Sequence, residues 1–260
     1  MLPICLLLAL LLTVQTAFAK DLTVHVDGQE LTGGSFAEEG VAYVPLAPLL
    51  EALGGWETGW DQPTRTATAD TGLFSLSVPA WRSQVLADGF PFDTSAATLV
   101  RGGCTYVPLR SLASLLGARV EFVDWSSPVT VSSGQEAEYT EEDLYWLSRI
   151  ISAESRGESL LGQMAVGNVI LNRRASGKFP DTIQGVIFDR KDAVQFEPVA
   201  NGTIYDEPTR QSILAARLVL SGASVVGGCM YFFNPSLSTG QWIRRNCTYY
   251  TSIGCHMFYQ

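Results

Sequence analysis

The sequence contains little histidine and few basic residues. It has two His among 260 residues, and its 17 Lys and Arg against 26 Asp and Glu give a net charge of -9. Because nucleic-acid binding depends on Lys and Arg at the phosphates, this composition excludes nucleic acid as a partner. It also disfavours electrostatic capture by anionic wall polymers or membranes. Two histidines offer little material for a metal centre, and we expect no metal and no other cofactor.

Cysteine is also sparse, and the Cys-x-x-Cys spacing that is common in zinc sites does not occur. Cys229, Cys247 and Cys255 cluster near the C-terminus. In an exported chain we expect one disulfide among these three, as Cys247–Cys255 or Cys229–Cys255. Cys104 lies alone in the first half and is expected to be a free, buried thiol.

A long apolar run occurs only at the N-terminus. Residues 6–14 are apolar and lead to Ala17-Phe18-Ala19, which is typical of a signal peptide cleaved after Ala19. The run is short for a transmembrane helix, and no later stretch could span a bilayer. We therefore expect residues 1–19 to be a signal peptide and the mature protein to be secreted, without a transmembrane anchor.

The first half contains an internal duplication. Tyr-Val-Pro-Leu occurs at 43–46 and at 106–109, and Gly54 and Gly117 are likewise 63 residues apart. Asp-Gly pairs at 27–28 and 88–89 lie between apolar runs and predict hairpins. Each unit predicts a hairpin, a short helix ended by glycine (47–53 and 110–116) and closing strands. We expect a duplicated, β-rich α+β domain over residues 20–133 and a polar linker at 134–139.

This repeat resembles the copper amine oxidase N-terminal-like stalk domain. The name does not imply copper here, since no cluster of His, Cys and Tyr suited to copper is present. One interpretation is a spacer. The other is a wall-binding module that uses its tryptophans, Trp56, Trp60, Trp81 and Trp125, although aromatic residues in small β-rich units are more often core. A structural or weak binding role is favoured.

A helix is predicted after Thr140, which with Asp143 resembles a capping box. Leu147 lies on the apolar face of this helix, and Glu154, seven residues later, returns to nearly the same direction. Glu154 is therefore expected to be partly desolvated in the last turn, near the negative end of the helix dipole. Both effects raise the pKa of a carboxylic acid, which suits a general acid at neutral pH.

The alternative for Glu154 is a structural ion pair with Arg149 or Arg156 at the end of the helix. The motifs of the second half favour the catalytic interpretation. They comprise Ala153–Glu158, Gly162–Val166, Val169–Arg173, Phe179–Ile183, Gly185–Ile187, Gln195–Phe196, Asn234–Pro235, Trp242–Ile243 and Ile253–His256. In this order they resemble the SleB/CwlJ type of cell-wall hydrolase.

The resemblance implies a lysozyme-like or lytic-transglycosylase-like α+β domain over residues 140–260, with Glu154 as the catalytic residue. It also implies that a glycan groove is lined by substrate-binding residues. The candidates are Glu158, Gln163, Asn172, Gln195, Phe196, Tyr231, Asn234, Trp242 and His256. A structural role is the alternative for His256.

A conventional glycosidase needs a second carboxylate across the sugar. Glu158, Glu197 and Asp206 are candidates, but none has a claim comparable with that of Glu154. A lytic transglycosylase works with one glutamate, and the resemblance implies this reaction on the muramyl β-1,4 bond of peptidoglycan. The better-known members act on spore cortex during germination. The sequence leaves open cortex against vegetative wall, and it identifies no accessory spore protein.

Three other functions stay open from the sequence. A two-carboxylate muramidase would give reducing ends, and a wall-binding or assembly protein would retain the fold without activity. An amidase that cuts the stem peptide would need zinc or a Cys/His pair, and neither spacing is present.

Overall fold

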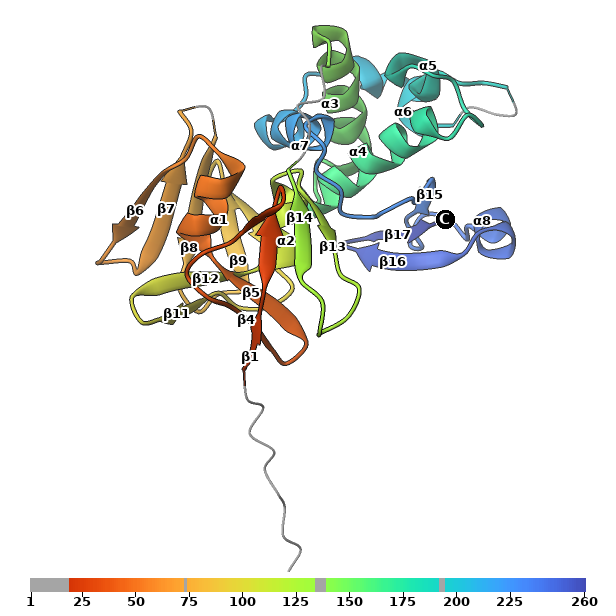
Figure 1. Cartoon of the computed structure of the whole chain (residues 1–260). Coiled ribbons are helices and arrows are strands. Elements are labelled where there is room, and N and C mark those ends of the chain that lie inside the picture. The colour runs from red at the N-terminus through yellow and green to blue at the C-terminus, as the bar shows by residue number, and fades with distance from the viewer. Residues whose placement is uncertain (1–18, 73, 134–138, 192–194) are drawn as a thin grey trace, which may run out of the picture.

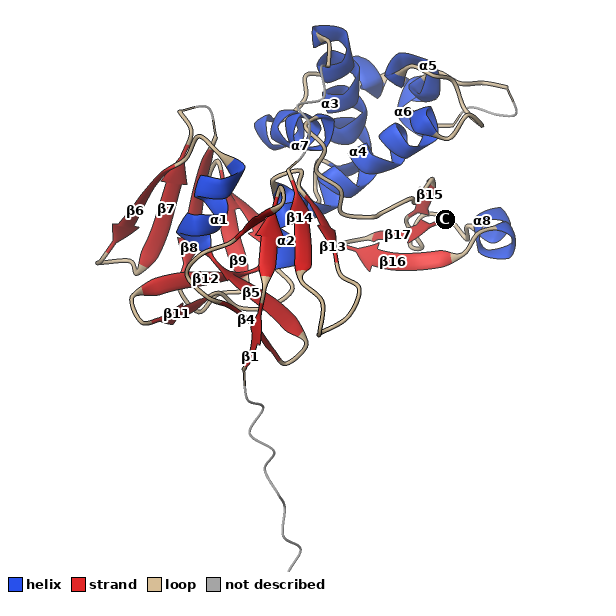
Figure 2. Ribbon diagram, viewed as in Figure 1, coloured by secondary structure: helices blue, strands red, loops and turns tan. Residues whose placement is uncertain are grey.

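The structure is a computed structural model that describes residues 19–72, 74–133, 139–191 and 195–260. The predicted signal peptide up to residue 18, and the predicted linker apart from residue 139, lie outside the described residues. Within them, no helix combines the length and the apolarity needed to cross a bilayer. Figures 1 and 2 show a β-rich first half and a second half that is mainly helical. The predicted α+β class is confirmed.

Three sheets form the first half. One has the strand order β1 (Lys20–Leu22), β4 (Ser35–Glu38), β5 (Val41–Pro45), β12 (Cys104–Pro108) and β11 (Leu99–Arg101). The second has the order β10 (Phe90–Asp93), β9 (Gln84–Ala87), β8 (Ser75–Pro79), β7 (Thr66–Asp70) and β6 (Glu57–Asp61). The third has the order β13 (Arg119–Glu121), β14 (Val129–Ser132), β2 (Val24–Val26) and β3 (Gln29–Glu30).

The two repeats contribute strands to each other's sheets. Strand β7 of the first repeat pairs with β8, which precedes the second Asp-Gly hairpin, and β14 of the second repeat pairs with β2 of the first. The equivalent strands β5 and β12 pair antiparallel at the centre. Each repeat therefore depends on the other to complete its sheets.

The local signals of the repeat are confirmed. Asp27 and Gly28 have φ of 48° and 82°, and Asp88 and Gly89 have φ of 47° and 80°, as two-residue hairpins with two positive φ values require. The helices α1 (Leu46–Leu53) and α2 (Leu109–Leu115) each begin one residue earlier than predicted. Their buried leucines pack into the core of the first half.

The second half is built around three helices, α3 (Glu141–Ser155), α4 (Leu160–Ala175) and α7 (Arg210–Leu220), which contact one another. The capping box is confirmed, because the Thr140 hydroxyl accepts from the Asp143 amide and the Asp143 carboxylate accepts from the Thr140 amide. Helix α7 begins at Arg210, since the hydroxyl of Thr209 accepts from the Ser212 amide as its cap.

Shorter elements surround these helices. They are α5 (Ile183–Ile187), α6 (Glu197–Asn201), the 3-10 turn Thr203–Tyr205, α8 (Gln241–Asn246) and a sheet in the order β15 (Tyr231–Phe233), β17 (His256–Tyr259) and β16 (Tyr249–Ile253). In α6, Pro198 lies in the first turn and Gly202 ends the helix with φ of 86°.

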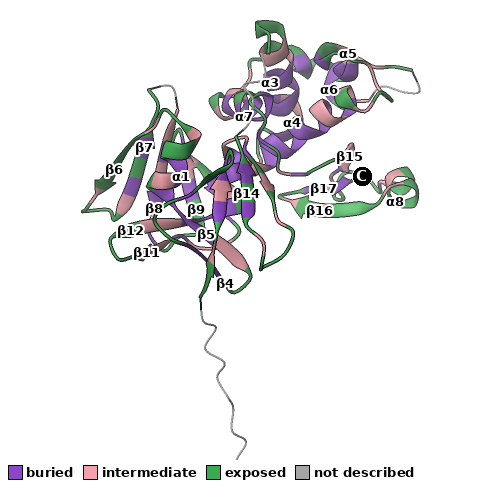
Figure 3. Cartoon of the chain, viewed as in Figure 1, coloured by how far each residue is buried: buried purple, intermediate pink, exposed green. Residues whose placement is uncertain are grey.

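The two halves share a hydrophobic core, and the buried residues in Figure 3 lie in both. Strand β10 contacts α4. The turn after α2 also meets the end of α7, since a β-carbon on Gly117 would lie 2.5 Å from the carbonyl oxygen of Ser221. Gly117 also has φ of 73°. This position therefore requires glycine both for its backbone conformation and for the space that a β-carbon would fill.

Gly117→Ala is expected to lower the free energy of unfolding more than Gly54→Ala. Both positions have positive φ, which costs alanine about 1 kcal/mol or more. Only Gly117 meets another part of the chain, and relieving that overlap costs about 1–3 kcal/mol more. Urea unfolding of the full chain measures the difference. Equal losses in the two variants would contradict the close contact between the halves.

Candidate active site

A pocket of about 400 Å³ lies where the end of α3 faces the start of α6, β15 and the turn between β16 and β17. Six of the sequence-predicted site residues line it: Glu154, Glu158, Gln195, Phe196, Asn234 and His256. The structure therefore brings together residues that are up to about 100 positions apart in the sequence.

Glu154 reaches this pocket from the last turn of α3. Its carboxyl group is largely removed from water, and this burial, reinforced by the negative charge of Glu197, raises its pKa to about 7. The positive charge of Arg173 opposes the shift but does not overcome it. Glu154 is therefore largely protonated below neutral pH, as the sequence predicts for a general acid.

The structural alternative for Glu154 is wrong in the described part of the chain. The guanidinium of Arg149 pairs with Glu207 at 3.0 Å. The guanidinium of Arg156 donates to the hydroxyl of Ser152 at 3.4 Å. Neither arginine forms an ion pair with Glu154 among the described residues.

Arg173 is a site residue that the sequence reasoning missed. It comes from the last turn of α4, is 6% exposed, and lines the same pocket as Glu154. Its Nε donates to the Met230 carbonyl at 2.7 Å and its Nη1 to Gln195 Oε1 at 3.4 Å. Burial lowers its pKa to about 10, so it remains a cation at neutral pH.

Three aromatic rings also surround the Arg173 guanidinium, those of Phe179, Phe196 and Tyr231, at 4.8, 5.2 and 5.5 Å. They lie in three separate segments, and cation–π contact with each helps to hold the charge in place. The sequence signal was the Asn-Arg end of the Val169–Arg173 motif, but nothing local indicated where the side chain points.

Glu158 connects the α3–α4 loop to the turn between β16 and β17. Its carboxylate accepts from the Cys255 amide at 3.2 and 3.3 Å, and its Oε1 lies 3.7 Å from Nδ1 of His256. Gly254 leaves the room for this carboxylate, which a β-carbon there would overlap. Glu158 and His256 thus line the pocket, and their contacts join the α3–α4 loop to the turn between β16 and β17.

Gln163 was predicted to bind substrate, but this prediction is wrong. Its side chain is fully buried. The amide donates to the Glu158 carbonyl at 3.1 Å and accepts from the Ser212 hydroxyl at 2.8 Å. Gln163 therefore fixes the loop that follows Glu154 against α7, and it has no surface for a glycan.

Asn172, Tyr231 and Trp242 lie outside the lining of the pocket. The amide of Asn172 donates to the carbonyls of Gly227 and Cys229 at 2.7 and 2.8 Å, which indicates a structural role. The rings of Tyr231 and Trp242 meet edge to face at 5.6 Å, and Trp242 is 59% exposed. Tyr231 also lies beside Arg173, and Trp242 continues the aromatic surface from it toward solvent.

The cysteine predictions are wrong. Cys104, Cys229, Cys247 and Cys255 are all free thiols, and Cys104 is exposed rather than buried. Cys229 is buried beside the C-terminal sheet, whereas Cys255 lies in an exposed turn. In the described residues, no three of His, Cys, Asp and Glu are grouped to hold a metal ion.

Residues 157–259 match the family model described as Cell Wall Hydrolase. The C-terminal half is a cell wall hydrolase domain. Residues 25–131 match the model described as Copper amine oxidase N-terminal domain. Both family resemblances expected from the sequence are confirmed. The match to the cell wall hydrolase model begins three residues after Glu154, so the match itself does not include this residue.

Several relatives match the cell wall hydrolase domain. A spore cortex-lytic enzyme of Bacillus cereus is 38% identical over 120 residues, which are 46% of this chain and 45% of that protein. The spore cortex-lytic enzyme of Halalkalibacterium halodurans is 42% identical over 110 residues, 41% of this chain and 32% of that protein. The match thus spans less than half of each curated relative.

A solved structure also matches. The catalytic domain of the germination-specific lytic transglycosylase SleB from Bacillus anthracis is 38% identical and covers 47% of this chain and 97% of that structure, with a TM-score of 0.43.

Within the cell wall hydrolase domain, Glu154→Gln is expected to be stabilising at high pH. The raised pKa means that the folded state holds the proton more tightly than the unfolded state. The resulting stability is present below pH 4.5 and is lost as pH rises through about 7. The neutral amide avoids this loss, so the variant should gain up to about 3 kcal/mol at pH 8.5 and little at pH 5.

Urea unfolding at both pH values measures this gain. Glu142→Gln, on the exposed first turn of α3, is the control and should show no comparable dependence on pH. An equal effect of Glu154→Gln at pH 5 and pH 8.5 would mean that the Glu154 carboxyl is solvated.

Proposed function

We propose that this chain is a secreted enzyme that cleaves the glycan strand of peptidoglycan at the muramyl β-1,4 bond, with Glu154 as the general acid and base. The observation that supports it is the Glu154 carboxyl, which lies in a pocket of a cell wall hydrolase domain with a pKa of about 7. The relatives are named spore cortex-lytic enzymes, which favours peptidoglycan of the spore cortex as the substrate and germination as the stage at which the enzyme acts.

In the proposed reaction the protonated Glu154 donates its proton to the glycosidic oxygen, and the bond from that oxygen to muramyl C1 breaks. The Glu154 carboxylate then accepts the proton of the muramyl C6 hydroxyl as its oxygen bonds to C1. The product carries a 1,6-anhydromuramyl end, no water is consumed, and Glu154 is protonated again. One carboxyl group thus serves as acid and then as base.

Other pocket residues support binding in this proposal. Gln195, Phe196 and Asn234 line the pocket around Glu154, and Tyr231 with Trp242 offers an aromatic extension for a neighbouring sugar. Arg173 is a cation fixed beside the acid, suited to an anionic group of the muramyl substituent. The division into a stalk domain over 20–133, a linker at 134–139 and a catalytic domain over 140–260 belongs to the same proposal.

Glu154→Gln is expected to lower kcat on purified glycan strands by about 10²- to 10⁴-fold, because the amide cannot donate the proton. This corresponds to about 3 to 5 kcal/mol of transition-state stabilisation. Wild-type products should carry anhydromuramyl ends, which mass spectrometry identifies by the absence of one water. Asp206→Asn, at an exposed carboxylate, serves as the matched control with near-normal rate. Full activity in Glu154→Gln would remove this residue from the mechanism.

The second candidate function is a two-carboxylate muramidase, and the observation that favours it is Glu197. Its exposed carboxylate lines the same pocket and raises the pKa of Glu154 through its charge. In the transglycosylase, Glu197→Gln should cost less than about tenfold in rate and lower the pH at which activity declines, since it lowers the Glu154 pKa. Reducing-end products together with a loss as large as that of Glu154→Gln would establish the muramidase instead.

A further inference from the structure

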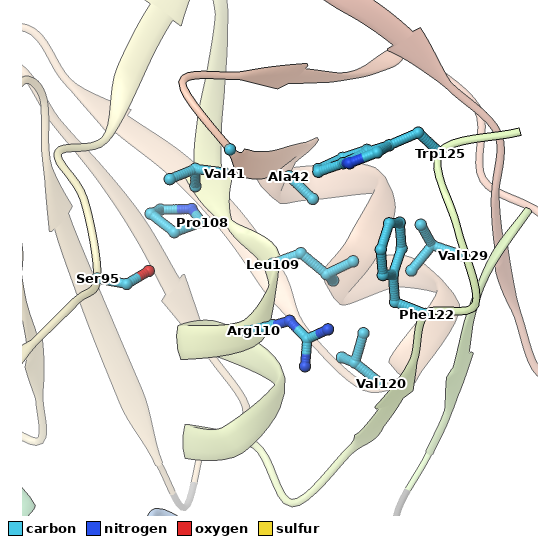
Figure 4. A pocket seen from close by; sticks show the side chains of 11 residues that line it. Val41, Ala42, Ser95, Pro108, Leu109, Arg110, Val120, Phe122, Trp125 and Val129 are labelled. Atoms are coloured by element: carbon cyan, nitrogen blue, oxygen red, sulfur yellow. The ribbon is translucent and has the colours of Figure 1, made fainter. Parts of the chain in front are cut away.

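The first half contains a second pocket, of about 280 Å³, away from Glu154. It lies between the β4–β5 turn, the start of α2 and the segment from β13 to β14 (Figure 4). Most of its lining is apolar, with one arginine and one serine: Gly40, Val41, Ala42, Ser95, Pro108, Leu109, Arg110, Val120, Phe122, Trp125 and Val129. A mainly apolar pocket with few polar groups is the usual form of a site for a small organic ligand.

Trp125 forms one wall of this pocket although it is 41% exposed. The ring of Phe122 meets it edge to face at 4.7 Å. The loop is fixed on both sides of Trp125: the Asp124 carboxylate accepts from the amides of Ser126 and Ser127 at 2.7 and 2.9 Å, and Lys20 Nζ donates to the Trp125 carbonyl at 2.8 Å. The indole is therefore held in place before any ligand arrives, which reduces the entropy lost on binding.

Arg110 lies at the opposite end of the pocket from Trp125 in Figure 4. It is exposed, and its guanidinium forms no ion pair or hydrogen bond with a described residue. In a chain with a net charge of -9, an unpaired cation in an apolar pocket is suited to an anionic group on the ligand.

The fold of the repeat does not require these side chains. At the constant offset of 63 residues, the first repeat has Ala47, Gly59 and Gln62 where the second has Arg110, Phe122 and Trp125. The first repeat nevertheless forms the same short helix and hairpin, α1 with β6 and β7. These three side chains of the pocket thus occur only in the second repeat, which points to a ligand and not to the architecture.

We propose that this pocket binds a muramyl-containing disaccharide unit of a glycan strand. The sugar ring stacks on Trp125, its acetamido methyl group lies on the apolar side chain of Val120, and the lactyl carboxylate of a muramyl residue without a stem peptide pairs with Arg110. This rests on the proposed function for the choice of polymer. Because the pocket and Glu154 belong to one chain, glycan bound here is held at high effective concentration for the cell wall hydrolase domain.

The test measures binding of N-acetylglucosaminyl-N-acetylmuramic acid to the full chain by isothermal titration calorimetry. This disaccharide lacks the muramyl β-1,4 bond and is not cut, so binding is independent of turnover. Trp125→Ala should weaken it at least tenfold. Trp60→Ala, which removes an equally exposed tryptophan from β6, is the matched control and should leave the affinity unchanged.

Arg110→Gln, an exposed substitution that leaves the wall of the pocket in place, should weaken the muramyl disaccharide about fivefold or more and leave chitobiose, which has no carboxylate, unaffected. Absence of saturable binding to the wild type overturns the proposal. Unchanged affinity in both Trp125→Ala and Arg110→Gln also overturns it, because the sugar would then be bound in the Glu154 pocket. Trp125→Ala should raise the KM for soluble glycan strands, because the effective concentration is lost, and should leave kcat unchanged, because the Glu154 pocket is intact. Failure of all cleavage with disaccharide binding retained would contradict the proposed function and leave this site standing.

Discussion

The protonated state of Glu154 depends on the burial of its carboxyl group at the end of α3. Leu147 and Ile151 precede it on the same face of the helix and are fully buried. The carboxyl group of Glu154 on this face is therefore also largely shielded from solvent. Two neighbouring charges act on it in opposite senses, Glu197 raising its pKa and Arg173 lowering it. Desolvation is the largest effect and decides the outcome. Hydrogen bonds from Gln163 to Glu158, from Ser212 to Gln163 and from Cys255 to Glu158 join the segments that form one side of the pocket.

Much of the fold and the candidate acid could be predicted because their signals are local. The seven-residue step from Leu147 to Glu154, the Thr140 capping box and the two Asp-Gly hairpins each depend on residues within about two helical turns of one another. Because the same local signals recur 63 residues later, they predicted the organisation of the whole first half. The family resemblance added the order of the motifs and, with it, most of the pocket lining.

The predictions that went wrong concern contacts distant in sequence. Arg173 is fixed by Met230, 57 residues later, and Gln163 is buried against Ser212, 49 residues later. A polar residue within a shared motif indicates a constraint, but the motif does not distinguish a groove residue from a buried hydrogen-bond partner. The disulfide prediction failed for a related reason, since closeness in sequence of Cys247 and Cys255 does not bring their sulfur atoms together.

The arrangement of charges around Glu154 also bears on the two mechanisms. Glu197 is exposed at the start of α6 and lines the same pocket as Glu154. Its charge adds to the desolvation that raises the pKa of Glu154, whether or not Glu197 touches the substrate. The presence of a second carboxylate in the pocket is thus explained without a catalytic role for it. This favours the single-acid transglycosylase, in which Glu197 raises the pKa of Glu154 and the C6 hydroxyl of the substrate is the nucleophile.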